Sequence, residues 1–318
     1  MADSFTGMSA LSSDTAAYEA LSYFALRPEL YFDAVADVKP TNQTHRGSSV
    51  TFFQYADIAA QTTPISETAD PDAVGASDAT VVVTPDEYGL VVKSTAQLRA
   101  TSLLDVSEDL ANLVGYNAGL TIDTLASDVL DGGTNVIWAT GGATTPTSQA
   151  TIDADDTLTV TDMRQVVAGL RGANVKPKTG NKYWGFIHPD VSFDVMNTTG
   201  TNGWTDPHAY SAPENIWSGE IGSIAGVRWV ETPRAPIVTD GGASAVDAYL
   251  TLVCGSQAIA LGHYNAAGYG RYPTIVRGPM VDALQRIQPI GWKHGIAYSI
   301  FRQAALRRIE SSSSIGSN

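Results

Sequence analysis

The segment between Arg46 and Lys93 constrains the fold of this chain more than any other part. It contains no lysine or arginine, and seven of its residues are carboxylates. It begins and ends with runs rich in β-branched and aromatic residues, 49–55 and 79–92, which predict the two strands of a hairpin. The residues between them, 56–78, are too many for a tight turn and too poor in large apolar side chains to form a core. Because a two-stranded arm is marginal in water, we expect it to lie against another subunit.

The composition is that of a folded, water-exposed chain. Its 318 residues are 43% hydrophobic, enough for a substantial core, and we expect two compact units plus extended excursions. No apolar run reaches the roughly 18 residues that cross a bilayer, and the first residues lack the basic and apolar regions of a signal peptide. The single cysteine, Cys254, excludes an intrachain disulfide, and its apolar neighbours predict a buried thiol.

The net charge of −14 argues against a chain whose main task is to neutralise phosphates. The charge is uneven, because residues 1–160 hold 5 basic and 22 acidic groups while residues 271–310 hold 7 basic and 2 acidic groups. One end of the chain can therefore attract the other end of a neighbouring copy. A surface that merely keeps the chain in solution is the alternative.

Helical periodicity is strongest from about Asp105 to Asp131, with acids in the first turn and a Gly-Gly pair at the end. Such a helix is roughly 40 Å long and is expected to act as a spine. Residues 161–265 alternate helical and strand-like segments and predict a mixed α/β unit. The chain is expected to end in strands.

No motif for catalysis or nucleotide binding is present. The sequence lacks a phosphate loop, a nucleophile elbow and a zinc-binding spacing, and its five histidines are scattered. Asp153, Asp155 and Asp156 form the densest acidic group, for which turn capping is favoured and a hard cation is the alternative. We therefore expect no enzyme, no metal and no cofactor.

Several segments resemble the major capsid proteins of tailed bacteriophages. They are residues 27–40, 47–74, the TPDEYG motif at 84–89, ANLVGYN at 111–117 and VLDGGTN at 129–135. The likeness covers nearly the whole chain, is strongest over residues 21–140, and implies the Hong Kong 97-like capsid fold. By this resemblance the fold class is α+β, with residues 1–40 as an N-terminal arm and 41–100 as an extended β-hairpin loop. Residues 101–160 and 266–318 form a peripheral domain with the spine helix, and 161–265 an axial α/β domain.

The resemblance implies a structural protein that assembles into pentamers and hexamers of an icosahedral shell around double-stranded DNA. Three sets of residues are then expected to contact neighbouring copies. The extended loop contributes Phe53, Tyr55, Pro64, Glu67, Asp70, Asp72, Asp86 and Glu87. The basic C-terminal segment contributes Arg271, Arg277, Arg286, Arg302, Arg307 and Arg308. The axial domain contributes Trp204, Tyr210 and Trp217.

Two departures from the family limit what is carried over. Some relatives join subunits covalently through a loop lysine, but this loop has none, so we expect a noncovalent shell. Some relatives begin with a long cleaved scaffolding region; we expect a separate scaffolding protein, with a portal and a possible decoration protein as further partners. Packaged DNA would lie nearby without sequence-specific binding and no membrane would be involved, with assembly in the host bacterial cytoplasm and the product located in the virion.

Two other readings remain open. One is a different self-assembling phage component, such as a tail or decoration protein. The other is an enzyme in which residues 56–78 form a mobile acidic flap over a cleft.

Overall fold

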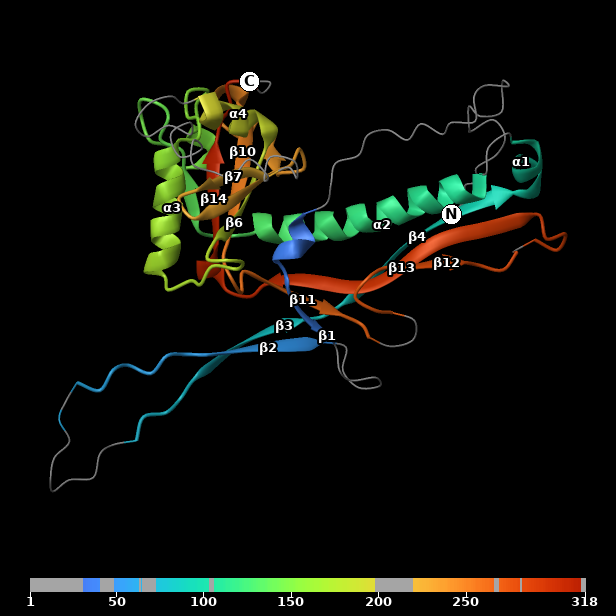
Figure 1. The fold of residues 1–318 in the computed structure, drawn as a ribbon, viewed down its shortest axis with the longest axis horizontal. Coiled ribbons are helices and arrows are strands. Elements are labelled where there is room, and N and C mark those ends of the chain that lie inside the picture. The colour runs from blue at the N-terminus through green and yellow to red at the C-terminus, as the bar shows by residue number, and fades with distance from the viewer. Residues whose placement is uncertain are drawn as a thin grey trace.

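A computed structural model describes residues 31–40, 49–62, 64, 73–102, 106–197, 220–265, 269–280 and 282–315. The seven-stranded sheet lies at one end of a long helix, the five-stranded sheet runs along that helix, and a β-hairpin projects from the side (Figure 1). The expected α+β class is confirmed. None of the described helices is both long and apolar enough to cross a membrane.

The long helix α2 spans Val106–Asp131 and confirms the predicted spine. At 1.5 Å per residue it is roughly 39 Å long. It lies along the strands β4 (Asp86–Thr95) and β13 (Ile287–Ile300), where the indole of Trp292 donates to Asn117 of the helix at 3.0 Å. Its other end contacts the second sheet, so this one helix connects the two sheets.

The five-stranded sheet is organised around β13. One edge of β13 pairs with β4. The strand order of the rest of the sheet is β1, β11, β13, β12. The remaining strands and the short helical segments beside them are η3 (Phe32–Val35), β1 (Asp37–Pro40), α1 (Ala96–Thr101), β11 (Ile259–His263) and β12 (Thr274–Arg277). Strand β1 pairs in parallel with β11, which fixes this part of the predicted N-terminal arm to the body of the same chain.

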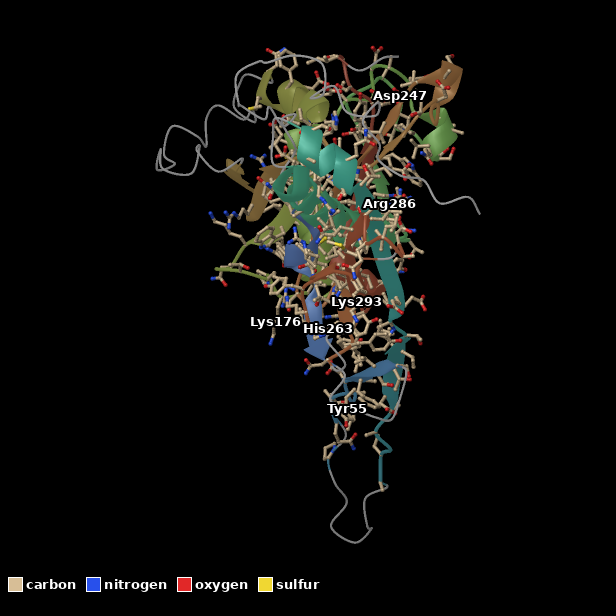
Figure 2. All side chains as sticks on the ribbon, turned by 90° about the vertical axis from the view of Figure 1, so that its right-hand side faces the viewer. Tyr55, Lys176, Asp247, His263, Arg286 and Lys293 are labelled. Atoms are coloured by element: carbon tan, nitrogen blue, oxygen red, sulfur yellow. The ribbon has the colours of Figure 1, made fainter. Side chains whose placement is uncertain are left out.

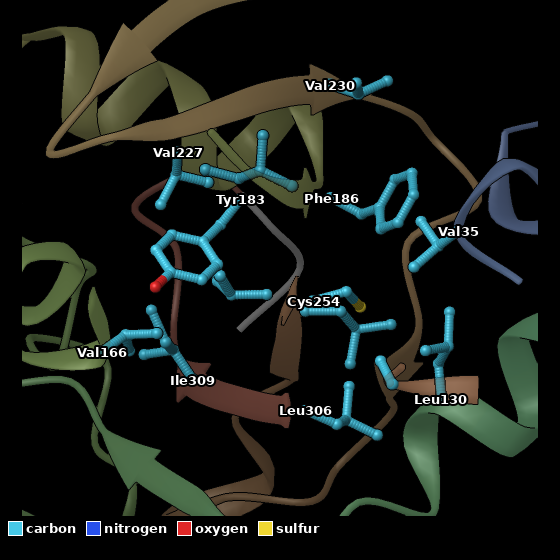
Figure 3. Packing of buried hydrophobic residues seen from close by; sticks show 14 of the residues in the cluster. Val35, Leu130, Val166, Tyr183, Phe186, Val227, Val230, Cys254, Leu306 and Ile309 are labelled. Atoms are coloured by element: carbon cyan, nitrogen blue, oxygen red, sulfur yellow. The ribbon is translucent and has the colours of Figure 1, made fainter. Parts of the chain in front are cut away.

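The seven-stranded sheet contains the largest core. Its order is β5, β14, β10, β6, β8, β7, with β9 paired to β10. The bounds are β5 (Val136–Trp138), β6 (Tyr183–Ile187), β7 (Glu220–Ile224), β8 (Val227–Glu231), β9 (Ile237–Val238), β10 (Ala248–Cys254) and β14 (Leu306–Ser311). All seven residues of β10 are buried, as expected of a central strand covered on both faces (Figure 3).

Helices cover this sheet. They are α3 (Val160–Gly172) and α4 (Pro189–Asn197), and the 3-10 segments are η4 (Gln149–Thr151), η6 (Ala243–Ala245) and η7 (Gln303–Ala305). Helix α3 begins with a capping box in which Thr159 and Asp162 satisfy each other's backbone N–H groups. Gly185 on β6 lies so close to Trp229 that an added Cβ would be 2.4 Å from the indole ring, so only glycine fits there.

The core residues pack as the periodicity of the sequence predicts. The ring of Phe186 packs against that of Phe32 from η3, with the two ring centroids 4.7 Å apart. Cys254 is fully buried among these side chains, and burial raises the pKa of its thiol to about 12. The predicted buried cysteine is therefore confirmed.

One sequence prediction about strands is wrong. The run 79–92 was expected to be a single strand, but it forms two strands, β3 (Asp78–Val83) and β4, that separate at Thr84 and Pro85. Proline has no N–H to donate to a ladder, so the chain changes partner there. Strand β3 pairs with β2 (Val50–Tyr55) to make the expected hairpin, whereas β4 joins the five-stranded sheet.

The domain boundaries remain a prediction. Within the described residues, the seven-stranded sheet combines strands from two of the expected domains, because β14 and β5 pair with each other and β14 also pairs with β10. Residues 86–95, expected in the extended loop, likewise belong to the five-stranded sheet.

Candidate assembly surfaces

The hairpin β2–β3 has one buried row and one exposed row of side chains. Val50, Phe52 and Val83 are 6%, 7% and 2% exposed, and they pack on Ala260 of β11. Gly262 lies beside them, and a Cβ there would be 3.2 Å from Val83 and 3.3 Å from Val50. Small residues on the sheet thus provide the surface on which the base of the hairpin rests.

The opposite row of the hairpin faces away from the body. Phe53 is 57% exposed, Tyr55 77% and Val82 56%, and we count with this row Ile58, which follows the end of β2 and is 60% exposed. Monomeric proteins seldom leave a contiguous row of large apolar side chains in water unless it binds something. Figure 1 shows that this part of the hairpin projects beyond both sheets.

The predicted loop residues fall into three groups. Phe53 and Tyr55 lie on the exposed row, and Pro64 is exposed beyond it. Glu67, Asp70 and Asp72 lie outside the described residues. The last group, Asp86 and Glu87, is not on the hairpin, because both residues pair with β13 at its root.

The root of the hairpin is held by two tyrosines and a cation–π contact. Tyr264 donates to the carbonyl of Pro85 at 2.5 Å, and Tyr269 donates to the carboxylate of Glu87. The Lys293 ammonium lies 4.4 Å from the centre of the Tyr269 ring. Glu87 therefore serves an intrachain contact, and its hydrogen bond raises the pKa of Tyr269.

The six arginines of the C-terminal segment divide into surface and buried-contact groups. Arg277 is exposed, Arg286 pairs with Asp282 at 2.6 Å, and Arg271 approaches Asp33 at 3.6 Å. Exposed pairs of this kind contribute little to stability, so these three side chains can exchange partners readily.

The other three arginines bind their own chain. Arg302 donates to the carbonyl of Ala173 and Arg307 to that of Gly169, both at 3.0 Å. Arg308 lies 3.0 Å from Asp131 and 2.7 Å from the buried carboxylate of Glu310. Burial raises the pKa of Glu310, and the charge of Arg308 opposes that shift. Through these hydrogen bonds and ion pairs, the guanidinium groups connect β14 and the residues just before it to α3 and to the end of α2.

A polar network lies between the five-stranded sheet and the segment η3. Tyr298 donates to Asp33 at 2.7 Å, and Asp123 of α2 accepts from the Phe32 N–H at 2.8 Å and from Arg234 at 2.9 Å. The network fixes η3 between α2 and the sheet.

The axial aromatic residues Trp204, Tyr210 and Trp217 lie outside the described residues. In the described segments, no group of three or more potential ligands is arranged to hold a metal ion. Asp156 is buried, and its carboxylate accepts from the backbone of Asp153 at 2.8 Å, which is the turn-capping role favoured above.

Sequence reasoning missed the apolar residues Ile58 and Val82 of the exposed row. Period-two alternation assigns Val82 to the face opposite Val83, so the signal was present. It was hidden because Val81, Val82 and Val83 form an unbroken apolar run that does not show which face is buried.

Comparison with known proteins agrees with this architecture. The family model described as phage capsid protein matches residues 8–302. No curated protein matches the chain. Among solved structures, the capsid of Ralstonia phage GP4 has a TM-score of 0.76 at 15% identity and covers 96% of this chain and 98% of that one. The capsid of cyanophage Pam1 has a TM-score of 0.73 at 13% identity, covering 99% and 100%. The head of Helicobacter pylori bacteriophage KHP40 has a TM-score of 0.67 at 11% identity, covering 98% of each chain.

The structural matches are distant in sequence and establish the fold, while the family model spans most of the chain. The chain therefore belongs to the phage capsid protein family, as a structural major capsid protein with the Hong Kong 97-like fold.

Proposed function

We propose that copies of this chain assemble, through pentamers and hexamers, into a closed icosahedral shell around double-stranded DNA. The hairpin of each copy lies over a neighbouring copy, and its exposed row becomes the buried side of that contact. Each contact can be weak, because one subunit makes many of them once a ring has formed.

The observation that carries this proposal is the contrast between the two rows of the hairpin. Val83 is 2% exposed and is covered by its own chain, whereas its neighbour Val82 is 56% exposed. Tyr55 and Ile58 continue the exposed row toward the tip. Covering this row with another subunit removes apolar surface from water, at about 25 cal/mol per Å².

The contacts are proposed to be noncovalent. Residues 47–92 contain no lysine, and Lys93 lies near the far end of β4, opposite Pro289. Particles boiled in detergent should give a single band near 33.5 kDa on denaturing electrophoresis. A ladder of multimers would show that subunits are cross-linked through another residue.

Two matched valine changes test the proposal. Val82→Ser and Val91→Ser remove the same methyl groups from strand residues that are 56% and 60% exposed, one on the hairpin and one on β4. We expect both variants to fold with the melting temperature of the parent, because surface changes usually alter stability by less than about 0.5 kcal/mol. Val82→Ser should prevent or slow shell formation, measured by sedimentation and negative-stain microscopy, and Val91→Ser should not.

Tyr55→Ser extends the test, since Tyr55 has the largest exposed fraction of the four side chains in the row. Normal assembly of both Tyr55→Ser and Val82→Ser, in yields equal to the parent, would rule out the hairpin as an assembly surface. Equal losses of shell formation in Val82→Ser and Val91→Ser would show that a polar change at any exposed valine impairs assembly, and would not identify the hairpin as the contact.

The basic C-terminal segment is a second proposed contact, in a narrower form than the sequence suggested. Arg277 and Arg286 are exposed and can meet the acidic loop of a neighbour. Charge reversal at Arg307 or Arg308 would break intrachain bonds to Gly169, Asp131 and Glu310, so a loss of shells there would not identify an interface. Arg277→Glu is the informative change.

The remaining partners follow from the same proposal. They are a separate scaffolding protein, a portal and a possible decoration protein, with assembly in the host cytoplasm and no catalytic role for this chain. The expected domain boundaries and the axial contacts of Trp204, Tyr210 and Trp217 belong to the proposal as well.

A further inference from the structure

The chain has a second cationic stretch besides its C-terminal segment. Residues 163–189 contain five lysines and arginines and no carboxylate, in a chain whose net charge is −14. They run from the first turn of α3 through the following loop to the start of α4. Such a local reversal of charge makes one spot on an otherwise acidic molecule attractive to anions.

The loop between α3 and β6 is a tight, rigid turn. Gly180 and Asn181 both have positive φ, 54° and 64°, between the bridged residues Thr179 and Lys182. The indole of Trp184 donates to the hydroxyl of Thr179 at 3.2 Å, which ties the turn to β6. The turn therefore holds Lys182 in a fixed place beside Trp184.

An arginine lies on the exposed face of that indole. Arg228 of β8 is the register partner of Trp184, and its guanidinium carbon lies 5.1 Å from the ring centre. The end of α3 reaches the same place, because a Cβ added to Gly226 would be 3.1 Å from the guanidinium of Arg171. Gly226 in turn accepts from the N–H of Tyr183 at 2.9 Å.

These contacts bring together Arg171, Lys182, Trp184 and Arg228, and Lys176 lies in the same loop between α3 and β6. We call these five residues the cationic platform. Arg171 and Lys176 are exposed, and Lys182, Trp184 and Arg228 are half-buried. Lys176 points into solvent at the edge of the molecule, whereas Arg286 lies toward the other side (Figure 2).

Three of the four platform cations, Arg171, Lys176 and Lys182, have no ion pair in the described part of the chain. Lys178 lies between Lys176 and Lys182 in the sequence, but it already forms an ion pair with Asp37 at 2.9 Å. Holding the three cations together costs free energy by mutual repulsion, which an anionic partner would relieve.

Two anions are candidates, and the platform's chemistry favours one. The acidic loop of a neighbouring copy is bordered by the apolar residues Tyr55 and Ile58, and covering it needs an apolar surface. The platform offers cations and one aromatic ring already occupied by Arg228. Lysines and arginines in a stretch without carboxylates suit the phosphates of duplex DNA, which proteins contact through such side chains.

We propose that the cationic platform is the surface through which each subunit contacts phosphate groups of the packaged double-stranded DNA, without reading its sequence. The inference rests on the proposed function, since it names the surface of the subunit that contacts the DNA inside the proposed shell. The net charge of the chain is −14, so repulsion limits how tightly the DNA is held and leaves it free to slide.

The test uses the purified, unassembled full-length chain and a fluorescein-labelled 40-base-pair duplex of arbitrary sequence. Lys176→Gln with Lys182→Gln removes two platform charges. Arg277→Gln with Arg286→Gln is the control, because it makes the same change in net charge on exposed residues elsewhere. Thermal unfolding of both double variants should match that of the parent.

We expect fluorescence anisotropy at 50 mM salt to show affinity lowered at least about tenfold in the platform variant and little changed in the control. The slope of log affinity against log salt should be shallower in the platform variant by about 1.8, which corresponds to two lost phosphate contacts at 0.9 each. A second duplex of different sequence should bind equally.

Three results would overturn the inference. Equal affinity of the two double variants for the duplex would mean that binding depends only on the net charge of the chain. No binding of the parent at 50 mM salt would mean that the platform does not hold DNA. Tighter platform-dependent binding of a synthetic peptide of residues 56–78 than of the duplex would assign the platform to a neighbouring copy. Shell formation is read separately by microscopy, so failure of the proposed function would be seen without the DNA measurement.

Discussion

The seven-stranded core and the β2–β3 hairpin are built from similar residues but differ in how much of their burial the chain itself provides. Every residue of β10 is buried by other parts of the same chain. The hairpin has only three side chains covered in this way, and its other row remains in water. The core is therefore complete within one subunit, whereas the hairpin leaves a row of side chains that, on our proposal, a neighbouring subunit covers. A capsid subunit needs both properties, because it must fold before it assembles.

The largest expected effect is in the core. Phe186→Ala should lower the free energy of unfolding by about 3–5 kcal/mol, because Phe186 is fully buried against Phe32 and its removal leaves a cavity. Chemical denaturation of the unassembled chain measures this. A loss below about 1 kcal/mol would contradict the view that this sheet is the chain's independent core.

The same substitution in the hairpin sharpens the comparison. Phe52 is 7% exposed and lies 5.6 Å from Phe301 between ring centroids. Phe52→Ala should lower the free energy of global unfolding by only about 1 kcal/mol, because the hairpin can open before the body unfolds and the loss cannot exceed the free energy of that opening.

The hairpin itself should respond strongly to that change. Chymotrypsin should cut Phe52→Ala near Tyr55 faster than it cuts the parent, as mass spectrometry of limited digests would show. Phe186→Ala compared under conditions where it remains folded is the control. Equal stability losses for the two phenylalanines, with no change in local cleavage, would mean that the hairpin is part of the core.

Local sequence patterns predicted the elements on both sides of this comparison. The spine helix was predicted to within a residue because its periodicity and final glycines are local signals. The strands of the hairpin were predicted from their β-branched and aromatic residues. The fold class followed from the resemblance, which the family model bears out.

The errors arise where distant residues decide the outcome. The break at Pro85 was visible in the sequence, but the new partner of β4 is β13, about two hundred positions later, and no local pattern identifies it. Arg307 and Arg308 looked like free surface charges because their acceptors lie on α3, α2 and β14. The cationic platform was missed for the opposite reason, since the absence of carboxylates from residues 163–189 was readable but was outweighed by the more basic C-terminal end.

The smallest expected effect concerns pH and the stability of the body under the hairpin. His294 is fully buried, and neither ring nitrogen has a hydrogen-bond partner in the described structure. Burial lowers the pKa of His294 from its ordinary value of 6.5, the charge of His263 on β11 lowers it further, and Asp33 on η3 opposes both. Tyr88 of β4 is its register partner, and Tyr298 of β13 donates to the same Asp33.

The sign of the effect follows from proton binding. As the pH falls below 6.5, the unfolded chain protonates this histidine while the folded chain keeps it neutral, so the unfolded state binds more protons and stability is lost. His294→Phe removes the titration and the two unpartnered nitrogens, and it should reduce the drop in melting temperature between pH 7 and pH 5. Parallel curves for the variant and the parent would show that other groups account for the acid sensitivity. A shallower curve would show that the body beneath the hairpin weakens in acid independently of the assembly surface, so acid effects on isolated subunits and on shells must be measured separately.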